Sequence, residues 1–219
     1  MKQFIFFFLL IPMVSISQPI TNGLIGNWPM DDDALDLSGN ANHGTVFGVL
    51  PEFDRNNSPS SAYVFDLSQY ISIGDPSEYD FGSQEFSVSI WINRTQTTTN
   101  WNNIVLGKWN TDNISGTNEW LLAASSTIDN NYPEFHVEIG STTYSVTSSS
   151  ELLLNKWYHL VAIRKTNILE LYLDGVLVGI NNTVPTGSIN MLQEELFNSE
   201  NLTIMGAQAI SMAAKWMKR

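Results

Sequence analysis

A short acidic stretch at residues 30–46, MDDDALDLSGNANHGTV, is the part of the chain whose residue types and spacing suggest chemistry. Its four carboxylates, Asp31, Asp32, Asp33 and Asp36, lie within six positions, and no Lys or Arg stands among them. Like charges this close repel one another, so something must make the crowding tolerable. Three explanations are open: a loop exposed to solvent, a bound cation, or a pair of catalytic carboxylates.

Calcium is the cation that this stretch suits best. It takes about six to eight oxygen ligands from carboxylates, Asn side chains and backbone carbonyls, and the stretch offers all three. Gly39 and Gly44 allow sharp bends because no Cβ restricts their backbone. The spacing is not that of an EF-hand. Catalytic carboxylates stand about 5–10 Å apart in a cleft, which adjacent Asp residues in a turn do not provide.

The composition predicts a globular domain with a polar but weakly charged surface. The chain has 219 residues, of which 43% are hydrophobic and 15% charged, and its net charge is −12. That length suits one large all-β domain, and the hydrophobic content supports a core. Without a block of Lys or Arg, the chain lacks the contacts that bind nucleic acids, and it does not suit an anionic membrane surface.

The first 17 residues are predicted to be a signal peptide, with Lys2 as the positive charge and an apolar run at residues 4–11. Small Ser residues precede the expected cleavage site before Gln18. We therefore expect a secreted or cell-surface protein. The apolar run is too short to span a bilayer, so we expect no membrane insertion after cleavage. The chain has no Cys, which leaves an exported protein to be stabilised by its core or by a metal.

Most of the remaining chain alternates between apolar and polar residues, which predicts β-strands. The period of two is clearest at residues 86–92 (FSVSIWI) and 157–165 (WYHLVAIRK). Residues 168–180 (ILELYLDGVLVGI) carry Asp174-Gly175 between two apolar runs, a strong signal for a hairpin turn. Shorter candidate strands lie at residues 62–67, 70–74, 103–109, 119–125, 134–140 and 142–148. Many short strands separated by Asn, Gly, Ser and Thr predict one all-β domain, a sandwich or barrel.

Five blocks of the sequence resemble the laminin-G-like, concanavalin A-type jelly-roll domains of secreted bacterial proteins. They are GLIGNWPMDDDALDLSGNANHGTVFG (23–48), SAYVFDLSQYISIGD (61–75), FSVSIWINR (86–94), NKWYHLVAIRK (155–165) and LELYLDGVLVG (169–179). Their order and spacing match, and WYHLVA followed by LYLDG is the most specific part. The resemblance implies an all-β, two-sheet antiparallel jelly-roll sandwich over residues 18–204. It also implies a binding role, commonly towards glycans, and often a structural calcium ion.

The resemblance also implies which residues would hold a structural Ca²⁺. In the resembled family, the Asp after the first strand and the D-x-S-G-N-x-N-x-G turn commonly surround calcium. The corresponding positions in this sequence are Asp31 or Asp32, Asp36, and oxygens of Asn42, His43 or Gly44. A solvated loop remains the alternative. The three His residues have neither His-x-His nor His-x-x-x-His spacing, so zinc is not predicted.

An enzyme is not predicted, although the same jelly-roll carries glycosidases. Those related enzymes place acids on one strand face as Glu-x-Asp-x-Glu or Glu-x-Asp-x-x-Glu, and this sequence lacks the motif. Glu134 and Glu138 are four positions apart, but residues 135–137 between them contain no acid. We therefore expect a non-catalytic module that recognises carbohydrate. Adhesion or recognition of an extracellular protein is the alternative.

Three Trp residues, Trp101, Trp109 and Trp120, lie in or beside loops rich in Asn, Thr and Gly. Exposed aromatic rings there would stack on the apolar C–H faces of sugars, and Trp101 and Trp109 are the candidate ligand-binding residues. The alternative is that these Trp side chains cap the ends of the sandwich.

Residues 205–219 do not fit the resembled family. NLTI at 201–204 looks like a family strand, but the sequence MGAQAISMAAKWMKR follows where the family has Gly-x-[Ile/Val]-Asp-[Asp/Glu]. Read one nucleotide earlier, the codons for residues 210–218 permit Gly and then Asp-Glu in the register of that strand. We therefore predict a frameshift near Met205. On this hypothesis the sheet lacks its closing strand, keeps an unpaired edge and loses one metal ligand.

Overall fold

The computed structural model describes residues 22–66, 69–74, 77–95, 104–108, 120–125, 131–189, 202–205 and 214–218. The predicted signal peptide lies outside these residues. A six-stranded sheet contains, in spatial order, β1 (Leu24–Trp28), β15 (Ala214–Lys218), β6 (Phe86–Asn93), β11 (Trp157–Lys165), β12 (Ile168–Leu173) and β13 (Val176–Asn181). A seven-stranded sheet contains β10 (Thr142–Thr147), β9 (Glu134–Ile139), β8 (Trp120–Ala123), β7 (Ile104–Lys108), β14 (Leu202–Met205), β5 (Tyr70–Gly74) and β2 (Thr45–Phe47).

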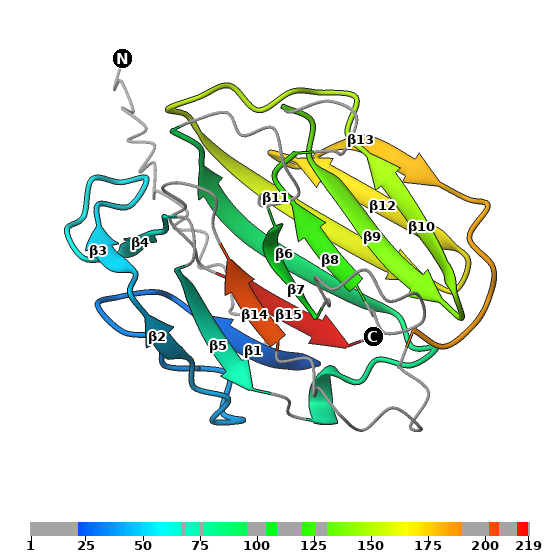
Figure 1. Ribbon diagram of the computed structural model, residues 1–219, viewed down its shortest axis with the longest axis horizontal. Coiled ribbons are helices and arrows are strands. Elements are labelled where there is room, and N and C mark those ends of the chain that lie inside the picture. The colour runs from blue at the N-terminus through cyan, green and yellow to red at the C-terminus, as the bar shows by residue number, and fades with distance from the viewer. Residues whose placement is uncertain are drawn as a thin grey trace, which may run out of the picture.

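The two larger sheets lie one behind the other as an antiparallel sandwich, with β8, β9 and β10 in front of β11 and β12 in Figure 1. A small third sheet pairs β3 (Leu50–Glu52) with β4 (Ala62–Val64). The short 3₁₀ turn η1 (Ser77–Tyr79) follows β5. Among all the residues that the structure describes, no helix is long and apolar enough to cross a membrane. The predicted all-β, two-sheet antiparallel fold is confirmed.

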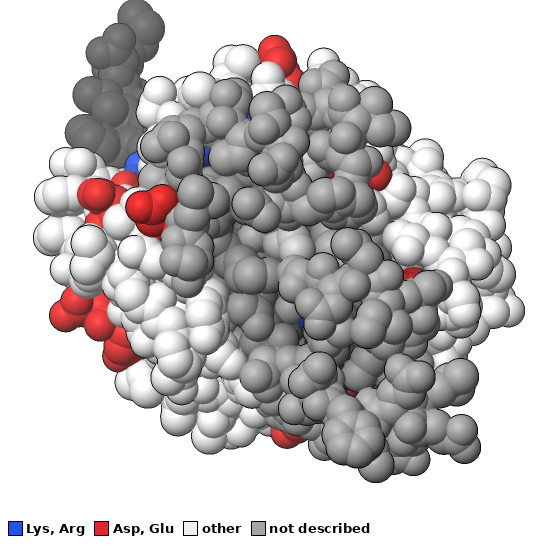
Figure 2. Space-filling view, viewed as in Figure 1, with Lys and Arg blue, Asp and Glu red and all other residues white. Residues whose placement is uncertain are grey.

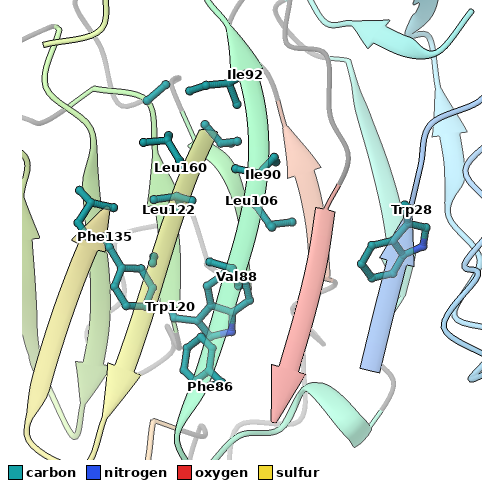
Figure 3. Packing of buried hydrophobic residues seen from close by; sticks show 14 of the residues in the cluster. Trp28, Phe86, Val88, Ile90, Ile92, Leu106, Trp120, Leu122, Phe135 and Leu160 are labelled. Atoms are coloured by element: carbon teal, nitrogen blue, oxygen red, sulfur yellow. The ribbon is translucent and has the colours of Figure 1, made fainter. Parts of the chain in front are cut away.

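The core lies between the two sheets, where long strands such as β6 and β11 contribute every second residue. Val88 and Ile90 of β6 face the same interior as Leu122 of β8, and all three are fully buried. Figure 3 shows these side chains converging between the strands, together with Phe86, Trp120 and Phe135. The ring of Phe86 lies 5.5 Å from that of Trp120 and 6.0 Å from that of Phe135. Aromatic contacts of this kind join the sheets at one end of the sandwich.

Strong alternation predicted the strands well. β11 has the predicted bounds, and the Asp174-Gly175 turn joins β12 to β13 with φ values of 49° and 81°. Positive φ at both residues is what a two-residue hairpin turn requires. On β11 the fully buried set is Tyr158, Leu160, Ala162 and Arg164, and the set with Trp157, His159, Val161 and Ile163 is half-buried on the opposite face. His159 is therefore a residue of the outer face of the sheet.

The end of the chain differs from the prediction that the closing strand is missing. Residues 214–218 form β15, which pairs antiparallel with β1 on one side and β6 on the other. Without β15, the facing backbone N–H and C=O groups of β1 and β6 would have no partners. Residues 214–218 contain no Pro, so their own N–H and C=O groups can pair with both strands. The sheet therefore has no unpaired edge at this place. Residues 202–205 form β14, as NLTI predicted. The frameshift stays a prediction about the nucleotide sequence.

A buried arginine fastens two loops to the six-stranded sheet. Arg164 is 1% exposed, and its guanidinium donates hydrogen bonds to the backbone oxygens of Gly82 (2.7 Å), Gln84 (3.1 Å) and Gly187 (2.5 Å). Burial lowers the pKa of Arg164 from its ordinary value, because the charged form loses water. The three carbonyls replace that water.

Replacing Arg164 with Met is expected to lower the free energy of unfolding by about 2 kcal/mol, because three loop carbonyls lose a charged donor. Urea unfolding followed by Trp fluorescence measures the change. The control is Lys156→Met, at an exposed lysine that directly precedes β11. Equal stabilities of the two variants would contradict the fastening role of Arg164.

Candidate functional site

The acidic loop joins β1 to β2, and Asp36 is its buried centre. The Asp36 side chain is only 5% exposed. Its Oδ1 accepts hydrogen bonds from the backbone N–H of Asn27 (2.9 Å) and of Ser38 (2.8 Å). Its Oδ2 accepts from the Ser38 hydroxyl (2.7 Å) and from the backbone N–H of Asn42 (3.1 Å). One carboxylate therefore ties the two halves of the loop to β1.

The second half of the loop closes back on the first and on the core. The Asp36 backbone N–H donates to His43 Nδ1 at 3.0 Å, and the Trp28 indole donates to the Asn42 carbonyl at 2.9 Å. Tyr79 of η1 donates its hydroxyl hydrogen to the Ile25 carbonyl at 3.1 Å. Burial, aided by the negative charge of Asp36, raises the pKa of Tyr79 and keeps this hydroxyl protonated.

The two glycines of the loop, Gly39 and Gly44, are required for different reasons. Gly39 has φ of +99°, as the prediction of a sharp bend requires. Gly44 has no positive φ and is required by packing instead. A Cβ at this position would stand 2.6 Å from Ile71 Cγ2 and 2.9 Å from Ala34 Cβ. Gly44 thus lets the loop lie against the core at the start of β2.

The structure brings some of the predicted calcium ligands together, because Asp36 Oδ2 accepts from the Asn42 N–H and the Asp36 N–H donates to His43 Nδ1. Asp31, Asp32 and Asp33 are exposed, whereas Asp36 is turned inward. In Figure 2 acidic side chains gather along the left margin, on the side where Figure 1 places β3 and β4. Among the described residues, no group of three or more His, Asp or Glu side chains is placed to hold a metal ion. The oxygens of Asp36 accept from N–H and O–H donors, and calcium stabilisation through this loop stays a prediction.

A second polar cluster lies on the outer face of the seven-stranded sheet. Phe135 and Val137 of β9 point into the core, so Glu134, His136 and Glu138 occupy the opposite face. All three are buried, at 5%, 5% and 3% exposure. The spacing of Glu134 and Glu138 had indicated one shared face, but it could not indicate that both carboxylates are buried.

Glu134 has the electrostatics of a permanent carboxylate. Burial alone would raise its pKa, but hydrogen bonds from His136, Ser145 and Thr147, with the charge of His136, outweigh burial and lower that pKa to about 2. His136 Nε2 lies 3.1 Å from a Glu134 carboxylate oxygen, and the Thr147 hydroxyl donates to Glu134 at 3.0 Å. A glycosidase acid needs a raised pKa so that it can donate a proton. The lowered pKa of Glu134 therefore argues against that role.

An exposed aromatic pair lies on the same outer face of the seven-stranded sheet, at the edge where β2 pairs with β5. Phe47 and Tyr70 are cross-strand partners whose rings stack with centroids 4.5 Å apart and planes at 19°. Phe47 is 43% exposed, and Tyr70 is half-buried. Thr45 and Ser72 form the next pair on this face. Sequence reasoning missed Phe47 because three residues between Gly44 and Gly48 are too short for a period of two to be recognised.

The candidate sugar-binding Trp residues have different outcomes. Trp101 and Trp109 lie outside the described residues. Trp120 is fully buried in the core, where its ring lies 6.2 Å from that of Phe81. Trp120 therefore packs within the sandwich and is not available to a sugar.

Comparison with solved structures supports the sandwich over nearly the whole chain. Domain 4 of AbnA, an extracellular GH43 arabinanase from Geobacillus stearothermophilus solved in complex with arabinotriose, is similar with a TM-score of 0.67. The two are 15% identical, and the match covers 89% of this chain and 92% of that domain. The binding domain of Paraclostridial Mosquitocidal Protein 1 matches with a TM-score of 0.64, 13% identity and 90% coverage of this chain.

A third similar structure is the binding domain of Botulinum Neurotoxin DC in complex with SialylT, with a TM-score of 0.57 and 14% identity over 91% of this chain. The chain spans about half the length of both toxin binding domains, 48% in each case. No curated protein matches the chain. The family model of the concanavalin A-like lectin/glucanases superfamily, Laminin_G_3, matches residues 65–206. That match covers more than half of the chain, which therefore belongs to this superfamily as a laminin G-like domain.

Proposed function

We propose that the chain is a secreted, non-catalytic module that binds carbohydrate through the aromatic pair Phe47 and Tyr70. The observation that carries the proposal is this exposed stacked pair on the outer face of the seven-stranded sheet. The similarity to an arabinanase domain solved with arabinotriose, and to a toxin binding domain solved with SialylT, supports a glycan as the ligand.

The chemistry of the pair suits a sugar. The C–H faces of sugar rings are apolar and pack on aromatic side chains, and stacking of Phe47 on Tyr70 fixes both rings in place, which lowers the entropic cost of binding. Thr45 and Ser72, the next cross-strand pair on this face, supply hydroxyl groups that can donate to and accept from sugar hydroxyls. The platform therefore combines an apolar surface with neutral hydrogen-bonding groups.

Absence of catalysis is part of the proposal. Glycoside hydrolysis requires one carboxylic acid with a raised pKa beside a second carboxylate. The lowered pKa of Glu134 argues against that role, and the sequence lacks the acid motif of related glycosidases. Purified protein is expected to release no product from arabinans, β-glucans or chitin. Product release that disappears when a single Glu is replaced would overturn this part.

Replacing Tyr70 or Phe47 with Ala is expected to weaken binding of neutral oligosaccharides about fivefold, because each change removes one aromatic ring and leaves the other without its stacking partner. Isothermal titration calorimetry with arabinotriose and a panel of neutral oligosaccharides measures the change. The matched control is Tyr172→Ala, a half-buried tyrosine on the other sheet. Undiminished binding in both variants would contradict the platform. Loss on Trp101→Ala or Trp109→Ala instead would move the sugar site to those residues.

Protein recognition is a second candidate, favoured by apolar side chains on the edge strand β13. Val176, Leu177 and Ile180 are 64%, 46% and 56% exposed. Exposed apolar residues that lie close together are typical of protein-interaction surfaces. A Botulinum Neurotoxin DC binding domain of similar fold was solved with rat synaptotagmin II, at a TM-score of 0.52. Binding of a protein partner that is lost on Leu177→Ser but kept on Tyr70→Ala would support this function.

A further inference from the structure

A second cluster of aromatic and charged side chains lies on the outer face of the six-stranded sheet. Trp91 of β6 and His159 of β11 are cross-strand partners, and their rings stack with centroids 5.0 Å apart and planes at 21°. Trp157 lies two residues before His159 and therefore on the same face. All three are half-buried, so part of each ring is open to solvent. They form an aromatic platform on the sheet opposite to Phe47 and Tyr70.

A turn outside the sheet places a cation over this platform. The Arg55 guanidinium carbon lies 4.6 Å from the centroid of the Trp91 ring, and Arg55 is exposed. The turn is preorganised by Asp54, whose Oδ1 accepts from the backbone N–H groups of Asn56 and Ser58, each at 2.8 Å. Asp54 also donates its own N–H to the Ser58 carbonyl at 3.0 Å. Arg55 is therefore presented by a closed turn.

The acidic groups beside the platform, Asp54 and Asp174, both accept hydrogen bonds from backbone N–H groups. Burial, together with the positive charge of Arg55, lowers the pKa of His159, whereas Asp174 opposes the shift. The neutral ring shares a 2.7 Å hydrogen bond with the Ser89 hydroxyl. Asp174 Oδ1 accepts from the His159 backbone N–H at 2.8 Å. In a chain of net charge −12, Arg55 places a positive charge over this face.

We infer that Arg55, Trp91, Trp157 and His159 form a second sugar site, one that takes a saccharide carrying an anionic group. His159 and Arg55 already lie against the Trp91 ring, so the sugar ring packs on the half-exposed Trp157 side chain beside them. Its carboxylate or sulfate pairs with the Arg55 guanidinium, whose planar fork of N–H donors matches such groups. The inference rests on the proposed carbohydrate-binding function. It concerns the six-stranded sheet, so loss of sugar binding at the Phe47 and Tyr70 site would leave binding at this second site unchanged.

The alternative is that Arg55 only covers Trp91. A cation over an exposed ring stabilises a protein slightly and needs no ligand. Such a contact would affect the melting temperature of the protein but no binding curve. Ligand affinity is therefore the readout that separates the two roles.

The test compares one saccharide with and without its charge. Calorimetry with tri-galacturonic acid and with its methyl ester keeps the sugar ring and removes only the anion. Sialyllactose and a sulfated galactan oligosaccharide distinguish a carboxylate from a sulfate. The variant is Arg55→Gln. The control is Lys165→Gln, which removes a positive charge from the same face of β11, about 20 Å from His159 along the strand.

Wild-type protein is expected to bind at least one anionic saccharide about tenfold more tightly than its neutral counterpart. Arg55→Gln is expected to remove that preference, and Lys165→Gln to keep it within about twofold. Tyr70→Ala should leave anion binding unchanged, which separates this site from the Phe47 and Tyr70 platform. Binding of the sulfated probe alone supports the anion site and identifies sulfate. Failure to bind any of the anionic saccharides, or equal binding by the two charge variants, overturns the inference.

Discussion

Replacing Asp36 with Ala is expected to lower the free energy of unfolding by about 3 kcal/mol, in the presence and in the absence of calcium. The buried carboxylate accepts four hydrogen bonds, from the backbone N–H groups of Asn27, Ser38 and Asn42 and from the Ser38 hydroxyl. Ala leaves these donors in a partly buried loop without an acceptor. Their lost pairing accounts for the expected destabilisation.

Thermal unfolding in EDTA and in millimolar calcium measures this effect and tests the metal prediction together. For a domain of this size, about 3 kcal/mol corresponds to a fall in melting temperature of about 6–12 °C. The matched control is Asp31→Ala, an exposed acid of the same loop, which should change stability by less than about 0.5 kcal/mol. An Asp36→Ala variant as stable as wild type in EDTA would contradict the hydrogen-bonding role.

The calcium prediction has its own outcome in the same experiment. Calcium at 100 times its Kd would stabilise the wild type by about 2.7 kcal/mol through mass action. Equal melting curves of the wild type in EDTA and in calcium would refute calcium stabilisation. The crowding of the four acids would then be explained by exposure of Asp31, Asp32 and Asp33 and by the hydrogen bonds of Asp36.

Most of the fold follows from alternation of apolar and polar residues, because burial of one face of a strand fixes that period. β11 and the β12–β13 hairpin were predictable for this reason, since long strands and an Asp-Gly turn are strong local signals. β2 and β3 were not predictable. Each has three residues, all exposed, so no buried face leaves a pattern in the sequence.

The chemistry of the candidate sites was less predictable than the fold. Spacing showed that four acids are close in the chain, but the direction of each carboxylate depends on tertiary hydrogen-bond donors such as the Asn27 N–H. Spacing on β9 placed Glu134 and Glu138 on one face, whereas the depth of burial depends on the rest of the molecule. β15 was missed because a strand between two others is selected by their unpaired backbone, more than by its own side chains.

The other large expected effect is loss of stability in acid through Glu134. Its folded-state pKa of about 2 lies below the ordinary value of 4.5. Between these two pH values the folded state therefore binds fewer protons than the unfolded state. The contribution of Glu134 to stability is therefore fully present above about pH 4.5 and is lost as the pH falls towards 2. A shift of this size corresponds to about 3 kcal/mol.

Glu134→Gln isolates this contribution, because the amide does not titrate and carries no negative charge. The variant is expected to be less stable than wild type by about 3 kcal/mol at pH 7, and the difference should shrink as the pH falls from 4.5 to 2. Urea unfolding at steps across this range gives the two stability curves. Glu52→Gln, at an exposed glutamate on β3, should follow the wild-type curve throughout. Parallel curves for Glu134→Gln and wild type below pH 4.5 would mean that Glu134 titrates equally in both states. In that case the hydrogen bonds from His136 and Thr147 would not hold its charge, and the argument that Glu134 is a permanent carboxylate, unable to act as a glycosidase acid, would fail with them.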